Sequence, residues 1–285
     1  MFKELIVAEN AGFCFGVKRA VDTSTDYKEK SKSDIYTFGP LVHNKNVVDH
    51  LRQKGINEVD INNLDKLNDK DTVIIRSHGV SPQVMEQIKN TGAEVVDATC
   101  PYVLAIHKRV KKYYEQGYQI VIVGDKNHPE VVGSNGWCDN TAIITKDGEG
   151  LVISAPKVCI VAQTTEKKAN FEKVIEVVSK QCKEVVTFNT ICSATKERQT
   201  SAEDTAKTVD VMIVVGSRSS SNTTKLYEIC SKHCENTIFI DNGSEIPKWL
   251  FESENIKKVG ITAGASTPDW IIQDVLEKLR GYLEK

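Results

Sequence analysis

The chain has 285 residues, of which 40% are apolar and 27% charged, and its formal net charge is −2. This composition is typical of a soluble globular protein with room for about two domains. The near balance of 37 basic and 39 acidic residues argues against nucleic-acid binding. Apolar runs are far shorter than the ~20 residues of a membrane span, and no secretory signal is recognisable. We therefore expect a cytoplasmic protein that binds neither nucleic acid nor membranes.

Short apolar runs alternate with helical patterns along the whole chain. The predicted strands are residues 5–8, 35–38, 72–75, 94–96, 119–123, 158–162, 184–188, 211–215, 237–240 and 258–262. They lack strict alternation, which is typical of strands covered on both faces. Apolar residues spaced i, i+3, i+4, i+7 predict helices around 171–178 and 272–279. The pattern indicates an α/β protein with mostly parallel sheets, and we interpret the polar segment 57–71 as a surface excursion.

Three cysteines share one context, because each follows a predicted strand and opens a helical pattern. They are Cys14, Cys100 and Cys192, separated by 86 and 92 residues, close to one third of the chain. This spacing predicts three similar α/β units, for which we take the ranges 1–97, 98–189 and 190–285.

A cysteine at a helix N-terminus has a lowered pKa and more thiolate, the form that binds soft metals. Iron–sulfur clusters normally take four thiolates, so three converging cysteines could hold one and leave one iron open. The alternative is three buried cysteines without a common site. Cys138, Cys159 and Cys182 lack this context, and we expect them to be core or incidental residues. The pair Cys230 and Cys234 lacks the further ligands that zinc requires.

Polar loops follow most of the predicted strands. They carry His43, His78, His128 with Glu130, and the segments 163–166, 217–223 and 263–269. Backbone N–H groups at helix N-termini bind anions, so such loops could form a phosphate site. Each loop taken alone could equally be ordinary helix capping. Neither a GxxxxGK[ST] nor a GxGxxG motif is present, which disfavours nucleotide cofactors.

Several of these segments together resemble a known family, the 4-hydroxy-3-methylbut-2-enyl diphosphate reductases of the non-mevalonate isoprenoid pathway. The matching segments are AGFCFGV (11–17), GPLVHN (39–44), SHGV (77–80), DATCP (97–101), HPE (128–130), QTT (163–165), NTIC (189–192), SSN (220–222) and AGAS (263–266). They follow the family's order, which makes the resemblance far more specific than any single motif.

The resemblance implies a pseudo-threefold α/β trefoil around one oxygen-sensitive 4Fe–4S cluster per chain. Its ligands would be Cys14, Cys100 and Cys192. The residues implied to bind the substrate diphosphate are His43, His78, His128, Ser220, Ser221, Asn222 and Ser266. Thr165, favoured over Thr164, would contact the hydroxyl end of the substrate, and Glu130 would deliver protons.

The expected reaction is reductive dehydroxylation of an allylic alcohol. The open iron would bind and polarise the C4 hydroxyl, Glu130 would protonate it, and two electrons would expel water to give isopentenyl or dimethylallyl diphosphate. The resemblance also implies a ferredoxin- or flavodoxin-type electron donor. Two competing hypotheses are a non-catalytic iron–sulfur redox sensor or electron carrier, and a zinc hydrolase that uses His43, His78 and His128.

Overall fold

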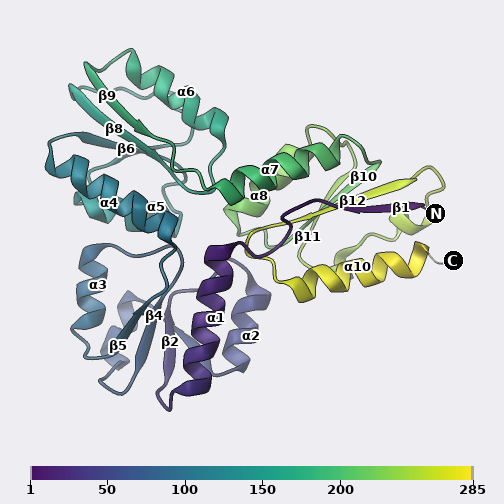
Figure 1. The fold of residues 1–285 in the computed structure, drawn as a ribbon, viewed down its shortest axis with the longest axis horizontal. Helices are drawn as coiled ribbons and strands as arrows, with labels where there is room; N and C mark the ends of the chain where they lie inside the picture. Colours follow the sequence, from purple (N-terminus) through teal and green to yellow (C-terminus); the bar gives the residue numbers. More distant parts are fainter. Residues whose placement is uncertain (1, 284–285) are drawn as a thin grey trace. The chain divides into compact units, whose positions relative to one another are not determined.

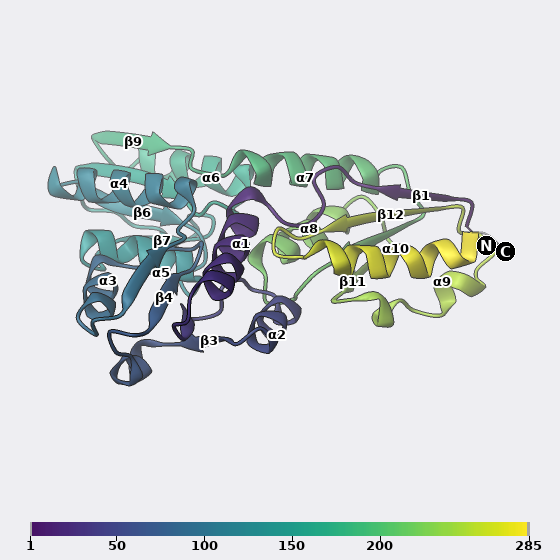
Figure 2. The ribbon, with the colours of Figure 1, turned by 60° about the horizontal axis from the view of Figure 1, so that its bottom comes forward.

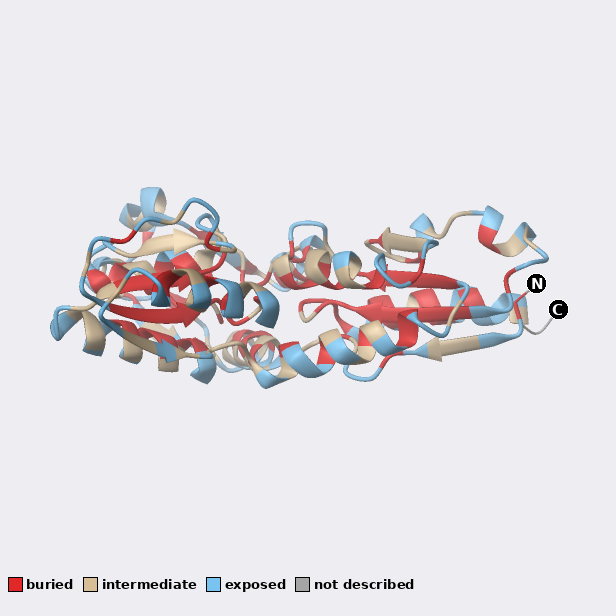
Figure 3. Cartoon of the chain, turned by 90° about the horizontal axis from the view of Figure 1, so that it is seen from above, coloured by how far each residue is buried: buried red, intermediate tan, exposed pale blue. Residues whose placement is uncertain are grey.

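A computed structural model describes residues 2–283, and its sheets are parallel throughout (Figure 1). Three four-stranded sheets lie within this described range, each with helices between its strands. Most residues of the central strands are buried, as the red strands of Figure 3 show, while the helices expose one side. This confirms the α/β prediction with parallel sheets.

The first sheet along the chain has the strand order β3-β2-β4-β5. Its strands are β2 (Ile35–Phe38), β3 (Ile56–Val59), β4 (Thr72–Ile75) and β5 (Glu94–Asp97). The helical elements before and between them are α1 (Phe15–Lys30), α2 (Lys45–Gln53), the 3-10 helix η1 (Ile61–Lys66) and α3 (Pro82–Lys89). Ser81 caps α3 with its hydroxyl and Pro82 occupies the first turn, a combination that favours helix initiation.

The second sheet has the order β7-β6-β8-β9. Its strands are β6 (Gln119–Val123), β7 (Ile143–Thr145), β8 (Lys157–Ala162) and β9 (Glu184–Phe188). The helical elements are α4 (Pro101–Glu115), α5 (Pro129–Asn135), the 3-10 helix η2 (Gly136–Cys138) and α6 (Lys168–Ser179). Phe171, Val174 and Val178 of α6 pack on one face of this sheet, as their helical spacing predicts.

The third sheet has the order β11-β10-β12-β1 and so includes the first strand of the chain. Its strands are β1 (Glu4–Val7), β10 (Val211–Val215), β11 (Thr237–Ile240) and β12 (Lys258–Ala263). The helical elements are α7 (Ser193–Ala206), α8 (Ser221–Cys230), the 3-10 helix η3 (Gly243–Glu245), α9 (Trp249–Glu252) and α10 (Asp269–Leu283).

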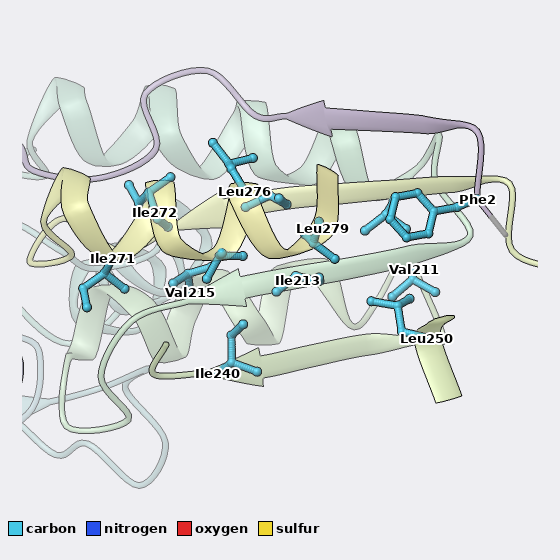
Figure 4. Packing of buried hydrophobic residues seen from close by; sticks show 14 of the residues in the cluster. Phe2, Val211, Ile213, Val215, Ile240, Leu250, Ile271, Ile272, Leu276 and Leu279 are labelled. Atoms are coloured by element: carbon cyan, nitrogen blue, oxygen red, sulfur yellow. The ribbon is translucent and has the colours of Figure 1, made fainter. Parts of the chain in front are cut away.

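Alternating residues of β10 divide the core of this third sheet into two layers. Val211, Ile213 and Val215 pack with the apolar stripe of α10 (Figure 4). Met212 and Val214 face the other way and pack with α7 and α8. The helices therefore cover both faces, as Figure 2 also shows for α7 and α10, and this burial explains why β10 lacks polar residues.

The three sheets repeat one strand order, in which the second strand is at one edge and the fourth at the other. In the third sheet β1 takes the place of the fourth strand, with Glu4 paired to Lys258. Each edge strand of this kind is followed by a junction cysteine: Cys14 after β1, Cys100 after β5 and Cys192 after β9. The repeat suspected from cysteine spacing is thus present in the topology. The domain ranges 1–97, 98–189 and 190–285 remain a prediction. Strand β1 lies in the first of these ranges but pairs in the sheet of the last one.

Two strands were missed by the sequence prediction, and both lie at sheet edges. β3 contains Asn57 and Glu58, which are exposed between buried Ile56 and Val59, so the segment 57–71 begins inside a strand rather than in a surface excursion. β7 is only three residues long and half-buried. An edge strand needs little apolar surface, because one of its sides has no neighbouring strand.

The chain forms two compact units, one of residues 1–17, 42–49 and 193–285, the other of residues 18–41 and 50–192. Within residues 2–283 no helix combines the length and apolar character needed to cross a bilayer.

Candidate active site

In the unit of residues 18–41 and 50–192, the Cys100 turn is joined to the loop that carries His78. Cys100 is the N-cap residue of α4, and its N–H donates to the carbonyl oxygen of Ser77 over 3.0 Å. The His78 ring lies edge-on to the ring of His128, with the ring centres 5.3 Å apart and the planes at 76°. His78 and His128, both predicted to bind diphosphate, are thus neighbours. The peptide group that joins Ser77 to His78 accepts the hydrogen bond from the N–H of Cys100, a predicted cluster ligand.

A buried histidine, His107, packs against the loop that carries His78. Gly79 has φ +69°, and a Cβ at this position would lie 2.6 Å from Cε1 of His107, so the loop backbone packs directly on the imidazole. His107 in turn stacks on Trp137, whose Nε1 donates to the carbonyl of Val80 over 3.2 Å. Burial lowers the pKa of His107 to about 4, so this support is a neutral ring at pH 7.

His128 begins α5 and caps it with its own side chain. Its Nδ1 accepts from the N–H of Glu130 over 3.2 Å, and Pro129 occupies the first helical turn. An imidazole nitrogen that accepts a hydrogen bond carries no proton, so the N–H of the neutral ring is on Nε2. The cap therefore fixes which nitrogen of His128 can donate to a ligand.

Glu130 is held by Thr164 through two hydrogen bonds. Its carboxylate is only 3% exposed and accepts from the Thr164 N–H (2.6 Å) and from the Thr164 hydroxyl (2.5 Å). The hydroxyl of Thr165 instead accepts from the amide of Gln163 over 2.8 Å. Thr164 thus contacts the acid through both its N–H and its hydroxyl, a detail that the QTT motif alone did not reveal.

The same segment leads to the next junction cysteine. The carbonyl of Thr164 accepts from the N–H of Cys192 over 3.0 Å, and Cys192 directly precedes α7. Thr190 ties this turn to β8 by accepting from the N–H of Ala162. A continuous series of contacts thus runs from Cys100 through His78, His128, Glu130 and Thr164 to Cys192.

In the other unit, Cys14 lies in a turn fixed to the end of β12. The N–H of Gly12 donates to Ala263 O (3.3 Å) and that of Cys14 to Ala265 O (3.2 Å). The Cys14 sulfur accepts from the Val17 N–H over 3.5 Å, so it lies at the N-terminus of α1. Gly12 adopts φ +97°, which a residue with a side chain would avoid.

The predicted binding residues Ser220, Ser221, Asn222 and Ser266 lie in the segments that follow β10 and β12. Asn222 accepts from the N–H of Ala265 over 2.9 Å, and the Ser266 hydroxyl donates to the carbonyl of His43 over 3.3 Å. Ser220 caps α8, and Ser221 is the first residue of that helix. The Nδ2 of Asn222 is buried without a hydrogen-bond partner among the described residues. It leaves a polar donor that a ligand could satisfy.

The cysteines at the three junctions differ in their surroundings from the other five. All eight, each within the described range, are free thiols. Burial raises the pKa of the five that are not at junctions, to about 12 for Cys159 and Cys230; the other three are Cys138, Cys182 and Cys234. Cys14, Cys100 and Cys192 are half-buried and each directly precedes a helix. Their position suits thiolate ligands of a soft metal centre.

Residues 5–280 match the family model described as LytB protein. The chain belongs to the LytB family. A curated relative from Clostridium perfringens (strain 13 / Type A), named 4-hydroxy-3-methylbut-2-enyl diphosphate reductase, is 51% identical over 98% of this chain and 99% of its own length. A relative of the same name from Clostridium tetani is 52% identical over 96% of this chain, but the match spans only 43% of that longer protein.

Solved structures agree with this family. One, of (E)-4-hydroxy-3-methyl-but-2-enyl diphosphate reductase, is 41% identical, with a TM-score of 0.72 over 98% of this chain and 100% of that one. Another, of the E-1-hydroxy-2-methyl-but-2-enyl-4-diphosphate reductase from Plasmodium falciparum, is 29% identical, with a TM-score of 0.89 over 98% and 88%.

Proposed function

We propose that this LytB protein reductively dehydroxylates 4-hydroxy-3-methylbut-2-enyl diphosphate to isopentenyl and dimethylallyl diphosphate. The family match over residues 5–280 carries the proposal. The series of contacts from Cys100 to Cys192 supports it, because it joins metal-ligand, anion-binding and acid groups at the ends of parallel strands, where α/β proteins bind ligands. A redox sensor or electron carrier would need the cysteines but not the histidine and hydroxyl loops.

Cys14, Cys100 and Cys192 would hold a 4Fe–4S cluster. The cluster would supply electrons and, at the iron without a protein ligand, a Lewis acid for the substrate hydroxyl. Cysteine chemistry supports this set of ligands, since burial disfavours the thiolate of the other five.

The diphosphate would be bound by imidazole, hydroxyl and amide donors, which are His43, His78, His128, Ser220, Ser221, Asn222 and Ser266. Two observations support this role. The capping bond of His128 leaves its Nε2–H as the donor, and the Nδ2 of Asn222 is buried without a hydrogen-bond partner within residues 2–283. Anchoring the diphosphate would hold the reactive end of the substrate in place, an effect that can contribute several kcal/mol.

Glu130 would supply the protons. The overall change breaks the C4–O bond and forms one C–H bond; two electrons and two protons enter, and the hydroxyl leaves as water. Thr164 would orient the Glu130 carboxyl by its two hydrogen bonds. Thr165 would contact the hydroxyl end of the substrate, with its side chain steadied by Gln163.

The two electrons would come from a small ferredoxin- or flavodoxin-type protein. We place the reaction in the cytoplasm, which the free thiols support, because thiols stay reduced in that compartment.

The test is anaerobic purification, followed by quantitation of iron and sulfide and by product analysis with the diphosphate substrate and a chemical reductant. We expect four irons and four sulfides per chain and both products. Cys100→Ser should lose iron, whereas the matched variant Cys230→Ser, in a buried core position, should keep it. Zinc without iron, or an iron–sulfur protein that leaves the substrate unchanged, would refute the proposal.

A further inference from the structure

A buried arginine binds the backbone of the Cys14 turn. Arg198 lies on α7, is 2% exposed, and follows Cys192 by six residues. Its Nη2 donates to the carbonyl of Gly12 over 2.8 Å, and its Nη1 to the carbonyl of Ala194 over 3.3 Å. Gly12 also donates its N–H to Ala263 O, so both polar groups of this residue, two positions before Cys14, are held.

A second arginine does the same for the Cys100 turn. Arg19 lies on α1, five residues after Cys14, and its Nη1 donates to the carbonyl of Thr99 over 3.0 Å. The Thr99 carbonyl and the Cys100 N–H belong to one peptide group, whose N–H is bound by Ser77 O. The peptide before Cys100 is therefore fixed at both ends, and its plane cannot rotate without breaking a bond.

The charge of these side chains is informative. A guanidinium is always protonated, and burying one, as in Arg198, is costly unless negative charge lies nearby. Arg19 is only half-buried. Three thiolates with an iron–sulfur core carry net negative charge, and this charge increases by one when the core is reduced. Arginine beside these turns would therefore favour both binding and reduction of the cluster.

We propose that Arg19 and Arg198 are positioning residues for the iron–sulfur cluster, which fix the Cys100 and Cys14 turns and supply positive charge beside them. This inference rests on the proposed function, since the cluster is part of it. The arginines set how long the protein retains iron and how readily the cluster is reduced.

Arg109 provides a matched control on a junction helix. It lies on α4, which follows Cys100, but its guanidinium stacks on the ring of Phe188 at 5.1 Å. Its Nη1 donates to Ala105 O of its own helix. It is thus a half-buried arginine on a junction helix whose contacts are outside the cysteine turns.

The experiment compares wild type with Arg198→Met, Arg198→Lys, Arg19→Met and Arg109→Met, each reconstituted anaerobically with iron and sulfide. Circular dichroism and thermal unfolding of the apo-proteins check folding. Iron release to an excess of ferrozine and reduction potentials from visible absorption are then measured. We expect Arg198→Met and Arg19→Met to release iron about 10–100-fold faster and to have a lower reduction potential. Arg198→Lys should release iron faster while keeping a potential close to wild type, because the charge remains, and Arg109→Met should match wild type.

The possible failures are distinguishable. If the two Met variants fold and retain wild-type iron release and potential, the positioning role is refuted while the proposed function stands. If Arg198→Met fails to fold, Arg198→Lys decides, since wild-type iron release from this variant would refute the geometric role. If wild type itself binds no iron–sulfur cluster, the proposed function fails and this inference with it.

Discussion

Replacing Glu130 by Gln removes the ionisable proton but can keep the two hydrogen bonds that hold the side chain. The Thr164 N–H needs an acceptor, which the Gln carbonyl oxygen can provide. The Gln amide can donate to the Thr164 hydroxyl, which then accepts instead of donating. Both hydrogen bonds, at 2.6 and 2.5 Å, can therefore persist in a side chain of the same shape, and only the ionisable proton and the charge are lost.

The expected cost in stability is small. A hydrogen bond to a charged group contributes about 1.5–3 kcal/mol and a neutral one about 0.5–1.5 kcal/mol, so two bonds lose about 2–3 kcal/mol together. Part of this loss is offset, because a neutral amide costs less to bury than a carboxylate. We expect the midpoint of thermal unfolding to fall by less than about 5 °C. The unfolding midpoint of Glu130→Ala should fall further, since this variant leaves the buried Thr164 N–H without the Glu130 acceptor.

The expected cost in activity is large. A positioned general acid contributes about 10²–10⁴-fold, and turnover of Glu130→Gln measured anaerobically at saturating substrate should fall by that factor. Iron content and the apparent KM should stay close to wild type, because no proposed cluster ligand or diphosphate contact has changed. Turnover within about 3-fold of wild type would show that the protons arrive by another route.

Three further variants test the supporting contacts. Thr164→Val should lower turnover by about tenfold or more and more than Thr165→Val does, because Thr164 holds Glu130; equal effects in steady-state kinetics would contradict this. His107, with its pKa lowered from 6.5 to about 4, stays neutral in the fold while the unfolded chain takes up a proton. Wild type should therefore lose up to about 3 kcal/mol as the pH falls from 6.5 to 4, and denaturant titrations of His107→Phe should lack this part of the loss. Gly12→Ala should destabilise the apo-protein by about 1–3 kcal/mol, since φ is +97° and the new Cβ would lie 2.8 Å from Ile272 Cδ1. The variant reconstituted with iron and sulfide should also contain less iron than wild type; an unchanged unfolding midpoint would contradict the strain.

Much of the fold could be predicted because its central strands are continuous apolar runs. The ranges 119–123 and 211–215 agree residue for residue with the central strands β6 and β10. The edge strand β3 was missed because Asn57 and Glu58 interrupt its apolar residues. The edge strand β7 was missed because it is only three residues long. The pairing of β1 with β12 could not be predicted from local pattern, since its partner is 254 residues away (258 − 4).

The candidate site residues were named from motifs, but their contacts were not. The motif QTT contains two adjacent threonines with identical side chains, and only the backbone direction after β8 decides that Thr164 contacts Glu130. The contacts of Arg19 and Arg198 could not be predicted from the sequence, because an arginine in a polar helical pattern is usually at the surface. Their role depends on turns about 80 and 186 residues away along the chain.

The pairing of β1 with β12 has a consequence for the order of assembly. The sheets of β2–β5 and β6–β9 are each built from consecutive segments and can form as soon as those segments leave the ribosome. The remaining sheet needs the first strand to wait for residues translated more than two hundred positions later. Until then the strand that leads to Cys14 has no partner, so assembly of the proposed metal centre would be a late, post-translational event.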